Sequence, residues 1–276
     1  MTNNKLTNRN YTPNRALKSL IEDYSQQQTS NTTLNEFLTF RILSGRSTRS
    51  DWHRRPTIRI IISLLGASGV GKTVLSQCLQ YGRLPENCKH PPMTVGIDMQ
   101  FYHLDKLFRN EYAVIIQLND PPGQERFESA TNHFFRQCHG VLLLADTSRI
   151  ETLERLEKYW FRKLEKLSMD HVQTTLVCTK IDLLENQSED YCRTFFQQAE
   201  QFTVTHQMSM VQVSAYRGEN VEHIFKQLII RILSDTTLVD ELISKATVRE
   251  RTSRDTLSLD SQKSGNKTKK QLKCCK

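Results

Sequence analysis

The sequence lacks both a long apolar run and a paired cysteine spacing. Its longest apolar stretches are strand-length, well below the ~20 residues that a membrane-spanning helix needs, and no basic-then-apolar segment follows Met1. The seven cysteines are odd in number and mostly scattered, which argues against a disulfide framework and favours a reducing compartment. We therefore expect a cytoplasmic protein that contacts membranes, if at all, through its ends.

Acidic residues are missing from the end of the chain. The net charge of +8 is uneven, because the last fourteen residues hold six lysines and no Asp or Glu. A local excess of this kind gives no reason to expect a nucleic-acid partner. At 276 residues, the chain is long enough for one domain with a sizeable core and polar extensions.

Strand-like and helix-like segments alternate in the middle of the chain, as the crossovers of a parallel sheet require. The expected strands are Ile58 to Leu65, Met99 to Leu104, Tyr112 to Leu118, Val141 to Ala145, Thr175 to Cys178 and Met208 to Val213. The expected helices are Lys72 to Tyr81, Glu151 to Leu167, Tyr191 to Phe202 and Val221 to Leu233. The pattern predicts an α/β fold with a six-stranded, mostly parallel sheet flanked by helices.

Polar segments flank this domain, which we place at residues 57–234. Residues 1–56 are rich in Asn, Thr, Ser, Gln and Arg and carry two weakly amphipathic patches, so we expect a polar extension that is at most part helical. Residues 235–276 turn polar and lysine-rich, and we expect a flexible tail that ends in a double cysteine.

A glycine-rich loop follows the first expected strand. Gly66-Ala67-Ser68-Gly69-Val70-Gly71-Lys72-Thr73 reads as strand, loop and helix start, the arrangement that cradles the phosphates of a nucleotide. The loop's N–H groups can bind the β-phosphate, Lys72 can lie between the β- and γ-phosphates, and the Thr73 hydroxyl can bind Mg²⁺. The loop therefore predicts a nucleoside triphosphate site.

A second phosphate element follows the expected strand that ends at Leu118. In Asp120-Pro121-Pro122-Gly123-Gln124, Asp120 can hold Mg²⁺ through water, the Gly123 N–H can reach a γ-phosphate, and Gln124 can orient the attacking water. An Asp-Pro-Pro-Gly sequence is, on its own, also an ordinary turn. The phosphate loop upstream favours the phosphate interpretation.

The choice of base is predicted by Thr179-Lys180-Ile181-Asp182, which follows another core strand. Asp182 can accept hydrogen bonds from N1 and N2 of guanine, a pairing that adenine cannot offer. A Thr-Lys-x-Asp sequence in isolation is also typical of a helix cap. Its position after a strand favours guanine recognition over an adenine-specific ATPase or kinase.

These motifs, in this order and spacing, resemble the Ras superfamily of small GTPases over about residues 57–234, and the Rab branch most of all. Thr94-Val95-Gly96-Ile97-Asp98 resembles the first switch and Gly123-Gln124-Glu125-Arg126-Phe127 the second. The segment Asn132 to Gly140 resembles the Rab stretch of two aromatics and an arginine that leads into the fourth strand. Ser214-Ala215 resembles the last guanine motif, with Tyr216 where lysine is common.

The resemblance implies a switch that binds GTP and GDP with Mg²⁺ and hydrolyses GTP in vesicle or membrane trafficking. Thr94 would close on Mg²⁺ and the γ-phosphate in the GTP state, so Lys72, Thr94 and Gln124 would carry catalysis. No arginine finger is evident in cis, so an exchange factor, a GTPase-activating protein and effectors would act in trans.

The end of the chain and one departure from the family pattern bear on this expectation. Cys274-Cys275 resembles the double cysteine that Rab proteins have geranylgeranylated, which would hold the protein on the cytosolic face of membranes. Unmodified terminal cysteines are the alternative. Pro121-Pro122 removes two N–H donors before Gly123, so a catalytically weak GTP-binding scaffold or decoy for trafficking regulators is the alternative function.

Overall fold

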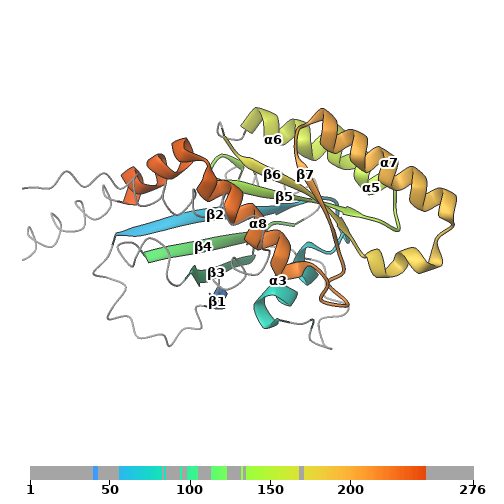
Figure 1. The fold of residues 1–276 in the computed structure, drawn as a ribbon, viewed down its shortest axis with the longest axis horizontal. Helices are drawn as coiled ribbons and strands as arrows, with labels where there is room; N and C mark the ends of the chain where they lie inside the picture. The colour runs from blue at the N-terminus through green and yellow to red at the C-terminus, as the bar shows by residue number, and fades with distance from the viewer. Residues whose placement is uncertain are drawn as a thin grey trace, which may run out of the picture.

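A seven-stranded sheet forms the centre of the molecule (Figure 1). The computed structural model describes residues 40–42 (backbone only), 56–82, 84, 94, 98–104, 113–122, 132, 135–167 and 171–246. The strands are β1 (Phe40–Ile42), β2 (Thr57–Leu65), β3 (Asp98–Leu104), β4 (Ala113–Asp120), β5 (Gly140–Asp146), β6 (Gln173–Thr179) and β7 (Ser209–Val213). Their order across the sheet is β1-β3-β4-β2-β5-β6-β7.

The predicted six strands are all present, and the sheet is mostly parallel. Strand β2 pairs in parallel with both β4 and β5, and the parallel ladder continues through β6 to β7. Strand β3 pairs with β4 in the antiparallel sense. The α/β fold predicted from the alternating pattern is therefore confirmed.

The seventh strand, β1, lies inside the segment that was expected to be a polar extension. It pairs antiparallel with β3, with Phe40 opposite Leu104 and Ile42 opposite Tyr102. Three residues are too few for a period of two to stand out in a polar stretch, which explains why the sequence did not indicate this edge strand.

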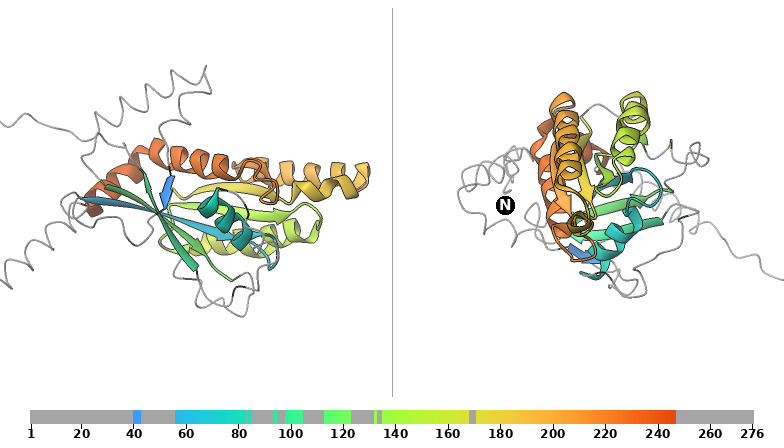
Figure 2. Two further views of the ribbon diagram at one scale, coloured as in Figure 1. Left: turned by 90° about the horizontal axis from the view of Figure 1, so that it is seen from below. Right: turned by 90° about the vertical axis from the view of Figure 1, so that its right-hand side faces the viewer.

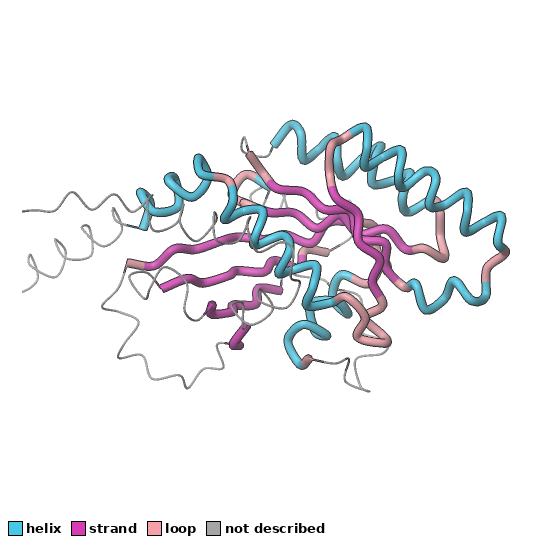
Figure 3. Tube along the Cα trace, in the orientation of Figure 1, coloured by secondary structure: helices cyan, strands magenta, loops and turns pink. Residues whose placement is uncertain are grey.

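Helices are present at each of the four predicted places in the described part of the chain (Figure 3). They are α3 (Lys72–Tyr81), α5 (Glu151–Arg155), η5 (Leu156–Phe161), α6 (Arg162–Leu167), η6 (Ile181–Asn186), α7 (Glu189–Thr205) and α8 (Val221–Ser234). The stretch predicted as one helix, Glu151 to Leu167, contains a π-helical segment at η5. Ser188 caps α7 by accepting from the Tyr191 N–H at 3.2 Å.

Two hydrophobic cores lie on the two faces of the sheet, with helices on both sides (Figure 2). Successive side chains of a strand point to opposite faces, and in β5 Leu142 and Leu144 join one core whereas Val141, Leu143 and Ala145 join the other. Helices α3 and α8 cover the first core, and α5, η5, α6 and α7 cover the second.

A further helix, residues 236–246, follows α8 and corrects the boundary expected at residue 235. Asp235 begins it by accepting from the Leu238 N–H at 3.1 Å. Four side chains of this helix are buried in the first core: Leu238, Val239, Leu242 and Ala246. Those apolar residues recur at helical spacing among polar ones, so the segment that looks like a linker is part of the packed domain.

The carboxyl ends of the parallel strands meet at one edge of the sheet, and this edge positions the site. Strand β2 is the point where the strand order turns, because its two neighbours β4 and β5 come later in the chain on either side of it. In open α/β sheets, ligands bind beyond the carboxyl ends of the strands at such a point. The glycine-rich loop leaves β2 there.

Candidate functional site

The glycine-rich loop has a backbone that only glycine accommodates easily. Gly66 has φ +149°, and a Cβ at this position would lie 2.5 Å from the Leu144 carbonyl oxygen. Gly71 caps α3 with φ 99° and leaves the first N–H groups of the helix without a side-chain acceptor. The loop therefore presents N–H donors and the positive end of a helix dipole, the chemistry of an anion site.

Lys72 is held under this loop. Its Nζ donates to the carbonyl oxygens of Gly66 and Ala67, both at 2.9 Å, and the residue is 7% exposed. Burial lowers the pKa of Lys72 to about 8, against the opposing effect of the Asp120 charge. The ammonium is thus preorganised at the loop, where a phosphate would compensate its desolvation.

Three predicted Mg²⁺ ligands come together beside Lys72. The Thr73 hydroxyl donates to Asp120 Oδ2 at 2.5 Å and lies 2.8 Å from the Thr94 hydroxyl. Burial raises the pKa of Asp120, an effect that the hydrogen bond from Thr73 and the charge of Lys72 oppose. Thr73 and Thr94 are far apart in sequence, so the fold itself gathers these oxygens.

This oxygen cluster fits a magnesium ion. Asp120 Oδ1 is buried, and no described residue donates a hydrogen bond to it. Mg²⁺ prefers carboxylate and hydroxyl oxygens and keeps several waters, so a site with one carboxylate and two hydroxyls suits it. Thr73, Thr94 and Asp120 are the side chains that would hold the ion, directly or through water.

The second phosphate element is described only at its start. Pro121 and Pro122 follow β4 and are both buried. Gly123 and Gln124 lie outside the described residues, so their predicted contacts with the γ-phosphate and the attacking water stay predictions.

The predicted base-recognition residues lie at the ends of β6 and β7. Thr179 Oγ1 donates to the Val70 carbonyl at 2.7 Å and lies 3.0 Å from the Ala145 carbonyl oxygen, which ties this motif to the phosphate loop. Asp182 Oδ1 accepts from the Ser214 hydroxyl at 2.5 Å. This hydrogen bond joins the two predicted guanine motifs.

The other predicted nucleotide-binding residues of these motifs are more peripheral. Ala215 is half-buried, and Tyr216 is 61% exposed. Lys180 has a left-handed backbone, with φ 61°, and its ammonium is 2.7 Å from Asp146 Oδ2. Lys180 is thus held by a carboxylate that the sequence reasoning did not single out.

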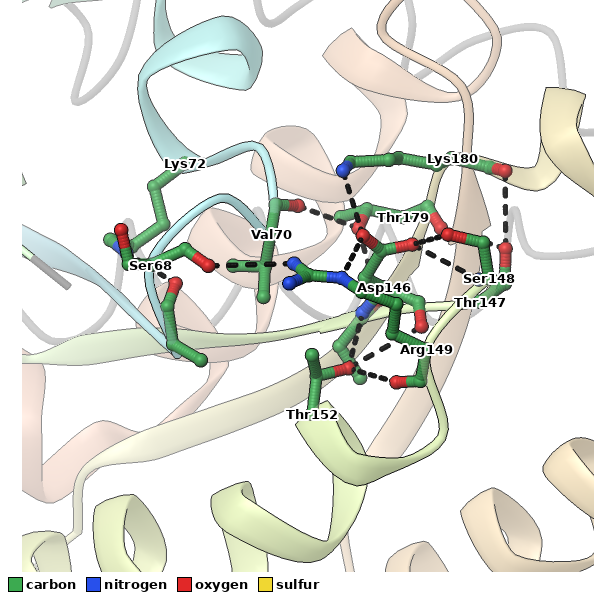
Figure 4. Close-up of polar contacts among 12 residues, drawn as sticks. Ser68, Val70, Lys72, Asp146, Thr147, Ser148, Arg149, Thr152, Thr179 and Lys180 are labelled. Carbon is green, nitrogen blue, oxygen red and sulfur yellow. Dashed lines mark hydrogen bonds and ion pairs between the residues drawn. The ribbon is translucent and has the colours of Figure 1, made fainter. Parts of the chain in front are cut away.

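Asp146, at the end of β5, was missed by sequence reasoning (Figure 4). It is fully buried and accepts from the Ser148 N–H and hydroxyl and from Arg149 Nε. Burial would raise the pKa of Asp146, but hydrogen bonds from Lys180 and Ser148 outweigh it and hold the pKa below its usual value. The signal that was missed is its position: Asp146 ends a fully buried strand, and Asp120 ends a strand that is buried at all but one residue.

Comparison with known proteins agrees with this geometry. A model of the Ras family matches residues 61–234. The chain belongs to the Ras family. Within it, this small GTPase is close to the Rab proteins, as the motifs predicted. The Ras-related protein Rab-30 of Homo sapiens is 32% identical over 186 residues, which cover 66% of this chain and 86% of Rab-30.

Two further Rab relatives cover similar spans of this Ras-family chain. Rab-5B of Plasmodium falciparum is 30% identical over 176 residues, 64% of this chain and 79% of the relative. Rab-12 of Mus musculus is 29% identical over 197 residues, 70% of this chain and 76% of the relative. The described helices include none that is long and apolar enough to span a bilayer. Cys274 and Cys275 lie outside the described residues.

Proposed function

We propose that this chain is a Rab-like switch that binds GTP and GDP with Mg²⁺ and hydrolyses GTP to GDP and phosphate. The observation that carries the proposal is the meeting of Thr73, Thr94 and Asp120 beside the buried ammonium of Lys72. A lysine for the phosphates and an oxygen cluster for a metal are what phosphoryl transfer by positioning and charge stabilisation requires. Family membership supports the nucleotide.

Each part of this site has a separate task in the proposal. Lys72 binds the β- and γ-phosphates, and Thr73, Thr94 and Asp120 hold Mg²⁺. Mg²⁺, when bound, neutralises the charge that develops on the phosphates. Because Thr94 reaches the site from a different segment than the loop, its release after hydrolysis would change the surface around it. Gln124 would orient the attacking water.

Guanine specificity is assigned to Asp182, with the Ala215 N–H facing the base oxygen. The hydrogen bond from Ser214 fixes one carboxylate oxygen of Asp182, which supports a role that needs a defined orientation. Asp182→Ala should abolish the preference for GTP over ATP in competition for the site. Tighter binding of ATP than GTP that Asp182→Ala leaves unchanged would instead support an adenine-specific P-loop enzyme.

Hydrolysis is tested by single-turnover conversion of bound GTP in the parent chain and in Gln124→Leu. We expect conversion in the parent and a much slower reaction in the variant, because the leucine cannot orient water. No conversion in the parent would contradict the enzyme. It would favour the second candidate, a GTP-loaded scaffold or decoy for trafficking regulators. The observation behind this candidate is the buried Pro121-Pro122 pair, which removes two N–H donors before Gly123.

A lipid-anchored role in membrane trafficking completes the proposal. Geranylgeranylation of Cys274 and Cys275 would attach the tail to the cytosolic face of a membrane, where its lysines add about 1 kcal/mol each near anionic lipid. An exchange factor, a GTPase-activating protein and effectors would act in trans. Membrane partition of the prenylated chain and of Cys274→Ser/Cys275→Ser tests the anchor: equal partition of both would overturn it.

A further inference from the structure

Arg149 extends from the turn after β5 to the outer side of the phosphate loop (Figure 4). Its Nη2 donates to the Ser68 carbonyl oxygen at 3.4 Å, across 81 residues of chain. A Cβ added at Gly69 would lie 3.5 Å from the same Nη2. The guanidinium therefore lies against the loop at Ser68 and Gly69.

The turn that carries Arg149 is fixed on both sides. The Arg149 N–H donates to the Asp146 carbonyl at 2.9 Å, and the Arg149 carbonyl accepts from the Thr152 hydroxyl at 2.7 Å. Thr147 adds a bond from its N–H to the Thr179 carbonyl at 3.0 Å. Because the backbone is held in this way, the guanidinium approaches the loop from a defined direction.

Asp146 links this arginine to the base-recognition motif. One oxygen, Oδ2, lies 3.0 Å from Arg149 Nε and 2.7 Å from Lys180 Nζ. The carboxylate has no exposed surface, whereas 41% of the Arg149 side chain and 33% of the Lys180 side chain remain exposed. A buried carboxylate between two cations orients both, and removing any member leaves the others poorly compensated.

The cluster also contributes charge to the phosphate loop. Arg149 and Lys180 are two cations against the single carboxylate of Asp146, so the cluster carries a net charge of about +1 next to the loop. Arginine keeps its charge at any working pH and presents fixed N–H donors, which suits it to holding a loop that must receive phosphates.

We propose that Arg149 is a positioning residue for nucleotide retention, which with Asp146 joins the guanine motif to the phosphate loop and slows release of guanosine di- and triphosphates. This inference rests on the proposed guanine-nucleotide function. It adds an outer link to the buried one from Thr179 to Val70. The outer link acts on the loop that holds the β-phosphate, so its loss should affect GDP and GTP but not GMP.

The test measures release of a fluorescent GDP analogue from the parent chain, Arg149→Ala, Arg149→Lys and the control Arg162→Ala. Arg162 is exposed on α6, and its removal changes the net charge equally. We expect release about tenfold faster in Arg149→Ala and at the parent rate in the control. Arg149→Lys should release at an intermediate rate, because lysine keeps the charge but lacks the planar set of guanidinium N–H donors. GMP affinity, measured by competition, should stay within about twofold of the parent.

The outcomes separate this inference from the proposed function. A parent chain that does not bind GDP would overturn both. Normal GDP binding by the parent with unchanged release in Arg149→Ala would overturn the inference alone. An equal loss of GDP and GMP affinity would also overturn it, because that pattern indicates a general loosening of the fold. If Arg149→Ala does not fold, Arg149→Lys decides by the same comparison.

Discussion

The Thr179 hydroxyl links the predicted base-recognition motif to the glycine-rich loop. Thr179 is 4% exposed, and its hydrogen bond reaches Val70 across 109 residues of chain. The motif Thr179-Lys180-Ile181-Asp182 could not indicate this contact, since the partner is a backbone carbonyl.

Thr179→Ala is expected to destabilise the protein by about 1–3 kcal/mol, because two buried carbonyls lose a nearby donor. Urea unfolding in the presence of GDP and Mg²⁺ measures the change. Thr179→Ser keeps the hydroxyl and should stay close to the parent. An alanine variant as stable as the serine variant would show that the hydroxyl contributes nothing.

His139 is a second residue with an expected effect on stability, because its buried side chain makes the free energy of unfolding depend on pH. The His139 Nδ1 accepts from the Ile61 N–H at 2.9 Å, and the backbone N–H of His139 donates to the Ile61 carbonyl at 2.8 Å. Burial lowers the pKa of His139 to about 4; the charge of Lys245 adds to this, and that of Glu241 opposes it. The buried imidazole is therefore neutral near pH 7.

Because the unfolded chain binds a proton near pH 6.5 and the folded chain only near pH 4, His139 should reduce the free energy of unfolding as pH falls between these values. The loss approaches about 3 kcal/mol at the lower end. Urea unfolding at several pH values measures it. His139→Gln, which retains a hydrogen-bond acceptor, should flatten this dependence, whereas His223→Gln at an exposed position should not. Parallel curves for His139→Gln and the parent would show that His139 does not cause the pH dependence.

Among the elements, the central strands were predictable because they are short continuous apolar runs, and the helices because their apolar residues recur with a period of 3.6. The predicted helix Lys72 to Tyr81 has the observed bounds of α3. The π-helical segment at η5, in which Trp160 and Phe161 are buried in the second core, was not predictable, since its apolar residues follow the same pattern as those of an α-helix.

The helix at residues 236–246 was missed because its four buried residues lie among polar ones after a natural helix end at Ser234. It closes one end of the first core and lines, with Ile61 and His139, a cavity of about 220 Å³. Its Lys245 pairs with Glu241 at 2.5 Å. The helix at residues 236–246 therefore packs on the first core rather than forming part of a flexible tail.

Truncation distinguishes this boundary from the expected one. A chain that ends at residue 246 should unfold at nearly the parent urea concentration, because the residues removed lie beyond the packed helix. A chain that ends at residue 235 should lose several kcal/mol, since burial of Leu238, Val239 and Leu242 disappears. Leu242→Ala alone should cost about 2–5 kcal/mol. Equal stability of the two truncated chains would contradict a structural role for the helix.

At the scale of the whole molecule, the site is assembled from the carboxyl ends of β2, β4, β5, β6 and β7. Sequence motifs predicted four of these contributions, because the glycine-rich loop and the segments that begin at Asp120, Thr179 and Ser214 each resemble a family motif. The fifth, Asp146 with Arg149, becomes visible only when the register places Asp146 opposite Thr179. The motifs could not indicate the contacts between segments far apart in the sequence that join the glycine-rich loop to the predicted base-recognition residues.

If this edge of the sheet is a guanine-nucleotide site, the chain should retain a guanine nucleotide through gentle purification. Chromatography of the nucleotide released on denaturation should give GDP or GTP at about one per chain, and Asp182→Ala should retain little. Recovery of an adenine nucleotide, or of none from a chain that also fails to bind added GDP, would contradict a guanine-nucleotide site.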